Sequence, residues 1–112
     1  MNKKARFLDR IVEVVVDCCA IELPDGSMSL VKEDVLGKSR AENVVMTRCI
    51  LAMMIVGEGF SITTAAQLMS RTPHAIRHLL DIGHNFHISS KAFRIASAQA
   101  TLACREIEAE GL

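Results

Sequence analysis

Residues 61–80, SITTAAQLMSRTPHAIRHLL, carry the strongest structural pattern in the sequence. The apolar residues of this stretch have the spacing of a helix-turn-helix: counted from Ile62, a small residue is fifth, and larger apolar residues are eighth, fifteenth and eighteenth. The small residue lets two helices approach closely, and the later ones cover the inner face of the second helix. These residues are Ala66, Met69, Ile76 and Leu79. The sequence therefore predicts a helix-turn-helix at about residues 62–86.

Polar residues mark the corner between the two predicted helices. Ser70, Arg71 and Thr72 interrupt the apolar pattern, and Pro73 follows them. The first turn of a helix accepts proline because that residue's N–H group has no helical partner. Thr72 is a residue type that caps helix N-termini. We therefore expect the second helix to begin at Pro73.

The charge of this region indicates an anionic partner. No acidic residue occurs between Gly59 and Leu80. Residues 37–80 carry five basic and two acidic residues, a net charge of +3, whereas residues 1–36 sum to −2 and residues 81–112 to −1. Affinity for phosphate comes from basic surfaces, so the positive segment is the one that would face DNA. The net charge of zero for the whole chain argues against nucleic acid, and because the local positive excess is modest we expect weak non-specific binding.

Length and composition predict a single all-α domain over residues 1–112. Half of the residues are hydrophobic, which is enough for a core, and only four are aromatic, all phenylalanine. The apolar set is mostly aliphatic and methionine, which suits packed helices better than a β-sandwich. We expect a bundle of five to six helices.

The first helix is predicted at residues 4–20, where apolar residues recur at spacings of three and four. The valines at 14–16 would also suit a strand, but the charged positions keep a helical period. The Pro-Asp-Gly turn at residues 24–26 ends this section. The predicted buried stripe consists of Phe7, Ile11, Val14, Val15 and Cys18.

Two more helices are predicted before the helix-turn-helix. A short one at residues 30–36 would be capped by Ser29. A long one would begin at Ser39, with Glu42 as the second member of a capping box, and would end near Gly57. It is apolar almost all round, which indicates a central, buried helix.

Arg48 interrupts the apolar run of this long helix. One interpretation is a side chain at the edge of the core with its charge reaching outward. The other is a contact to a DNA phosphate or base. The sequence leaves both open.

The last helix is predicted from Lys91 to about Glu108, after Ser89 or Ser90 as its cap. The second helix of the helix-turn-helix would end earlier, near Phe86. The apolar stripe of the last helix is Phe93, Ile95, Ala96, Ala100, Ala103, Cys104 and Ile107.

The sequence offers no pattern for a metal, a cofactor or catalysis. The four cysteines lack metal-ligand spacing and are expected as buried hydrophobes in a reducing cytoplasm. His74 and His78 have the spacing of a helical metal pair but no third ligand nearby. No nucleophile–base set or carboxylate pair is evident, so we expect no enzyme. We also expect no signal peptide and no membrane span.

Two stretches resemble the C-terminal DNA-binding domain of the bacterial replication initiator DnaA, which has a TrpR-like helical fold. The first is Lys38-Ser39-Arg40 followed by residues 44–53, VVMTRCILAM, which is similar to the basic loop and following helix of that family. The second is residues 61–78, which is similar to its helix-turn-helix signature. The resemblance covers roughly residues 5–85.

The resemblance implies roles for individual residues. Arg40, Arg48 and Thr63 fall on positions that the family uses against DNA, and Arg71 matches an arginine of its signature. The Asp-His-Thr-Thr that follows in the family is Thr72-Pro73-His74-Ala75 here. The phosphate-loop motif of the initiator's ATPase module does not occur. The chain therefore resembles a stand-alone relative of the DNA-binding domain.

These observations favour double-stranded DNA binding by a cytoplasmic, nucleoid-associated bacterial protein. The alternative is a helical interaction or dimerisation module that has lost DNA affinity, which the missing signature and the zero net charge favour. The sequence does not distinguish replication, transcription and mobile-element control. The predicted DNA contacts are Lys38, Arg40, Arg48, Thr63, Arg71, Thr72, His74, Arg77 and His78.

Overall fold

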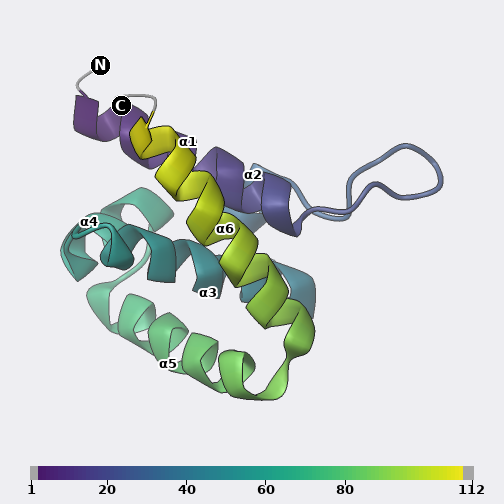
Figure 1. Cartoon of the computed structure of the whole chain (residues 1–112). Coiled ribbons are helices and arrows are strands. Elements are labelled where there is room, and N and C mark those ends of the chain that lie inside the picture. The colour runs from purple at the N-terminus through teal and green to yellow at the C-terminus, as the bar shows by residue number, and fades with distance from the viewer. Residues whose placement is uncertain (1–2, 110–112) are drawn as a thin grey trace.

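The computed structural model describes residues 3–109. Over this range the chain is all-α, with six helices and no β-strand beyond one isolated bridge (Figure 1). The all-α prediction is thus confirmed, at the upper end of the expected helix number. The helices are α1 (Lys3–Cys19), α2 (Lys32–Leu36), α3 (Glu42–Gly57), α4 (Ile62–Met69), α5 (Pro73–Ser89) and α6 (Lys91–Ala109).

Helix α3 is the centre of the bundle, as its nearly continuous apolar run predicts. It contacts each of the other five helices. Cys49, Leu51, Ala52 and Ile55 are fully buried along it. A helix surrounded on all sides has no polar face to present to water, which explains the absence of an amphipathic pattern.

The buried face of α1 differs from the predicted stripe. Leu8, Val12 and Val16 are buried in place of Phe7, Val14 and Cys18, which are only partly buried. Helix α1 packs against both α3 and α6, so its buried sector is centred between two neighbours. The spacing alone gives the period of the stripe but not its centre.

Helices α3 and α5 approach closely at Gly83. A Cβ atom at this position would lie 2.9 Å from the Sδ of Met53 and 3.4 Å from the Cβ of Cys49. Helix α5 continues to Ser89, three residues beyond its predicted end. Half-buried Phe86 stacks on Phe93 of α6 with ring centroids 5.5 Å apart, whereas residues 87–89 are exposed. The ring contact thus holds the end of α5 against α6.

Two predicted helix starts are wrong. The N-cap of α2 is Val31, whose N–H group donates to the Asp34 carboxylate at 3.0 Å, whereas the Ser29 hydroxyl accepts from the Ile21 N–H group. Helix α3 begins at Glu42 instead of Ser39. The residues between α2 and α3 form a loop instead, held by hydrogen bonds described below.

Candidate nucleic-acid interface

Helices α4 and α5 form the predicted helix-turn-helix. Ala66, Met69 and Ile76 are at most 3% exposed, and Leu79 is 8% exposed. The corner is therefore packed by the same four residues whose spacing indicated the motif. Both helices have side-chain caps: the Ser61 hydroxyl accepts the Thr64 N–H at 3.0 Å, and the Thr72 hydroxyl accepts the Ala75 N–H at 3.1 Å.

The turn between the two helices ends α4 with a left-handed residue. Ser70 has φ +53°, and no other non-glycine residue in the described range has a positive φ. The Arg71 N–H group donates to the Ala66 carbonyl at 2.9 Å, the hydrogen bond that closes a Schellman motif. Glycine is the usual residue at this position because it has no Cβ. The turn is therefore fixed by backbone geometry as well as by packing.

Seven of the nine predicted contacts are exposed. On α5, the side chains of His74, Arg77 and His78 lie three and four residues apart and so share one face. No acidic residue occurs in the sequence between Gly59 and Leu80, and Asp81, which is exposed, is the next acidic residue along the same face of α5. The seven exposed residues are Lys38, Arg40, Thr63, Thr72, His74, Arg77 and His78.

Arg71 is not one of them, because its guanidinium is directed into the protein. Its Nη1 atom donates to the Met69 carbonyl at 2.8 Å and its Nη2 atom to the Gly37 carbonyl at 2.6 Å. The second bond joins the helix-turn-helix corner to the loop after α2. Lys38 and Arg40, on that loop, are thereby held beside the start of α5.

Arg48 is also used inside the molecule. It is only 6% exposed, and its Nε atom donates to the Val35 carbonyl at 2.8 Å. Its Nη2 atom donates to the carbonyls of Asp34 and Gly37 at 3.0 and 3.1 Å. These carbonyls lie at the C-terminal end of α2, where helical pairing is incomplete, and the Asp34 carbonyl also accepts the Gly37 N–H group at 3.3 Å. Burial, together with the charge of Arg71, lowers the pKa of Arg48 from its ordinary value.

The prediction that Arg48 and Arg71 face DNA is therefore corrected. Neither interpretation of Arg48 holds as stated, because its charge does not reach outward and its guanidinium is instead buried on the carbonyls at the end of α2. Both guanidinium groups donate to the Gly37 carbonyl, so we call this arrangement the Gly37 clamp. The two arginines position the basic loop without being free to bind phosphate themselves.

The sequence analysis missed a second group of cations beside the motif. Lys4 and Ala5 of α1 and Thr64 and Gln67 of α4 line a shallow hollow between the two helices. The Lys4 ammonium lies 5.6 Å from the centroid of the Phe60 ring, a cation–π contact. The first turn of α1, residues 3–6, is thus next to the start of α4. The run Lys-Lys-Ala-Arg at residues 3–6 is a basic cluster visible in the sequence, but no sequence pattern indicates that it lies near residue 61.

Within residues 3–109, no group of three or more His, Cys, Asp and Glu side chains could hold a metal ion. No helix in this range is long and apolar enough to cross a membrane. The four cysteines are free thiols, and burial raises the pKa values of Cys49 and Cys104 to about 11.

Comparison of the chain with protein-family models, curated proteins and solved structures finds no match.

Proposed function

We propose that this chain binds double-stranded DNA through α4 and α5, with the start of α5 in the major groove. The observation that carries the proposal is a packed helix-turn-helix with exposed cations on α5, to which the Arg71–Gly37 hydrogen bond ties the basic loop after α2; its sequence has no acidic residue between positions 59 and 80. A DNA groove is lined by phosphates, so such a face suits it.

The exposed residues divide into two roles in this proposal. His74, Arg77 and His78 lie on the first turns of α5, the part of a recognition helix that reaches base edges. Arginine pairs well with guanine and contributes about 1–3 kcal/mol of discrimination. Lys38 and Arg40 would bind flanking phosphates, as would the free N–H groups at the starts of the two helices.

In this proposal the chain is a stand-alone relative of the DnaA DNA-binding domain and is located on the bacterial nucleoid. The support is the sequence of residues 38–53 and 61–78 together with the helix-turn-helix geometry. The residues that replace the Asp-His-Thr-Thr signature include Pro73, which begins α5. We therefore expect a DNA target that differs from the initiator's own.

The test is a fluorescence-anisotropy titration of a random-sequence DNA duplex at low and moderate salt. Wild-type protein is expected to bind, with log K falling against log salt by about 0.9 for each phosphate contact. Arg77→Ala is expected to weaken binding about tenfold, and Arg105→Ala, an exposed arginine of α6, serves as the matched control. Absence of binding at low salt, or equal losses in the two variants, would contradict the proposal.

The second candidate is a protein-interaction module of the same fold. It is favoured by a group of exposed apolar side chains far from the helix-turn-helix, at Ile21, Leu23, Met28 and Val31. An interaction through such a surface would show little salt dependence, because no counterions are released. The same titration therefore separates the two candidates.

A further inference from the structure

Between α1 and α2 the chain leaves the body of the molecule as a hairpin, residues 21–29, which projects away from the helices (Figure 1). Glu22 and Met28 form its antiparallel bridge, and Gly26, with φ +87°, closes the turn. An isolated two-stranded hairpin has marginal stability in water. A hairpin that stands clear of its own core is therefore a candidate for packing against another chain.

The hairpin carries much of the exposed apolar surface. Of the seven large hydrophobic side chains exposed in the described range, four lie on the hairpin or just after it. No large hydrophobic residue between positions 32 and 87 is exposed. A gathering of this kind marks an interaction surface more often than a scatter of single residues does. The four are Ile21 (68% exposed), Leu23 (42%), Met28 (46%) and Val31 (43%).

A cavity of about 330 Å³ lies at the base of the hairpin, between the end of α1 and the first halves of α3 and α6. Its lining is mainly apolar, and Ile95, 49% exposed, stands at it. The side chains that line it include Cys18, Cys19, Ile21, Met46, Phe93 and Ile95. The same side of the molecule therefore has an apolar projection and an apolar cavity next to each other.

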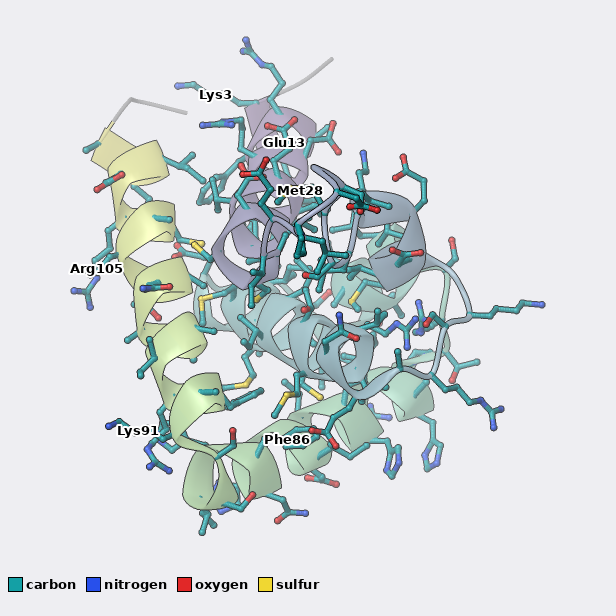
Figure 2. The ribbon with its side chains drawn as sticks, turned by 90° about the vertical axis from the view of Figure 1, so that its right-hand side faces the viewer. Lys3, Glu13, Met28, Phe86, Lys91 and Arg105 are labelled. Atoms are coloured by element: carbon teal, nitrogen blue, oxygen red, sulfur yellow. The ribbon has the colours of Figure 1, made fainter. Side chains whose placement is uncertain are left out.

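Charge indicates which partner fits. The only charged residues of the hairpin, Glu22 and Asp25, are acidic, which disfavours DNA and anionic membranes. The only charged residues in the first half of α6, Lys91 and Arg94, are basic. Figure 2 looks onto the side from which the hairpin projects, with Met28 on the hairpin and Lys91 at the start of α6. Basic residues that complement the acidic charge of the hairpin are thus present on the same chain.

We infer that this face is a homodimer interface in which the hairpin of each copy occupies the cavity of the other. A two-fold axis makes the two contacts identical, because each copy offers both the projection and the cavity. Leu23 and Met28 of one copy pack against Met46 and Ile95 of the second. The helix-turn-helix, at the opposite side of the molecule in Figure 1, stays free.

The test is sedimentation velocity of the full chain without DNA over a range of micromolar concentrations. Wild-type protein is expected to dimerise, and Leu23→Lys to raise the dimer dissociation constant about 30-fold or more, as for the loss of a central interface residue. Leu102→Lys is the matched control, since Leu102 is 58% exposed on α6 and does not line the cavity. Circular dichroism checks that the variants are folded, and Met28→Lys provides an independent second change on the hairpin.

Charge reversal tests the reciprocal arrangement. Asp25→Lys and Lys91→Glu are each expected to weaken the dimer several-fold, and the double variant is expected to recover much of the loss. A wild-type monomer at every concentration would overturn the inference, and so would a dimer that Leu23→Lys and Leu102→Lys affect equally. Because no DNA is present, a failure here is distinct from a failure of the DNA-binding proposal.

Discussion

The two ends of the molecule present opposite surfaces. At the helix-turn-helix end, exposed cations lie among small polar residues, and no large hydrophobic side chain is exposed between residues 32 and 87. At the hairpin end, the exposed side chains are mainly apolar and the charges of residues 21–29 are acidic. A phosphate backbone binds the first kind of surface, and protein surfaces bind the second.

The net charge of zero is thus the sum of two surfaces with different charge. The opposite charges of the two ends cancel in the sum over the chain, so the net charge gives no indication of the positive segment. Four predictions test how separate the two ends are.

The largest effect is expected inside the helix-turn-helix end, where the arginines are not equivalent. Arg48→Met removes the donors to three backbone carbonyls and should lower the free energy of unfolding by about 2–4 kcal/mol. Arg77→Met, on the exposed face of α5, should change it by less than about 0.5 kcal/mol. Urea denaturation measures both, and similar values would refute the Gly37 clamp.

The second prediction compares one lysine–arginine pair from each end. The double variant Lys38→Ala/Arg40→Ala should reduce the slope of log K against log salt for DNA binding by about two, since each phosphate contact contributes roughly one to that slope. Lys91→Ala with Arg94→Ala removes the same charge from α6 and should leave the slope unchanged. A lower slope in both double variants would mean that DNA contacts extend over both ends.

The third prediction concerns turns with a positive φ. Ser70→Gly should relieve the left-handed residue in the helix-turn-helix and raise the stability by about 0.5–1 kcal/mol. Gly26→Ser makes the reverse change in the hairpin, where φ is +87°, and should weaken the dimer while leaving the melting temperature of the monomer nearly constant. Thermal melts and sedimentation together distinguish these effects, and a destabilised Ser70→Gly would contradict the first.

The smallest effect is a pH dependence at the border of the helix-turn-helix. The hydrogen bond from Glu58 to Glu108, with burial and the nearby Glu108 charge, raises the pKa of Glu58 from its ordinary value of 4.5 to about 7, against the opposing charge of Arg105. The folded chain thus holds this proton more tightly than the unfolded chain. Its contribution to stability is present at acidic pH and is lost as the pH rises through about 7.

Glu58→Gln keeps a hydrogen-bond donor toward Glu108 and does not titrate. We expect the free energy of unfolding to vary less with pH between about 5 and 7 in this variant, by under about 1 kcal/mol because the pair is partly open to water. Urea denaturation at several pH values measures the difference, with Glu106→Gln as the control. An unchanged pH profile would show that the carboxyl pair does not form.

The helix-turn-helix was predictable from the sequence because its determinants are local. The apolar register from Ile62 to Leu79, the caps and Pro73 all lie within one short stretch. The centre of α3 was predictable for the same reason, from its continuous apolar run. The all-α class follows from these elements together.

The features that could not be predicted from the sequence depend on contacts between segments that are distant along the chain. Arg48 and Arg71 share a chemistry with Arg77, and only the fold shows that two of the three point inward. The start of α3 was misplaced because the Gly37 clamp, formed across 34 positions by Arg71, holds the loop that would otherwise have begun the helix. The proximity of residues 3–6 to α4 has the same origin.

The Gly37 carbonyl accepts hydrogen bonds from Arg48 of α3 and from Arg71 of the turn between α4 and α5, which makes one peptide group a junction of three chain segments. A loop held in this way has little conformational freedom left to lose when a ligand arrives, so a partner that binds Lys38 and Arg40 meets a surface already in its bound shape. Gly37 itself cannot be exchanged freely, because a Cβ there would lie 2.7 Å from the Glu33 carbonyl oxygen. Substitution at any one of these three positions is therefore constrained by the other two, although Arg48 is buried and Arg71 is half-buried beneath the surface that they shape.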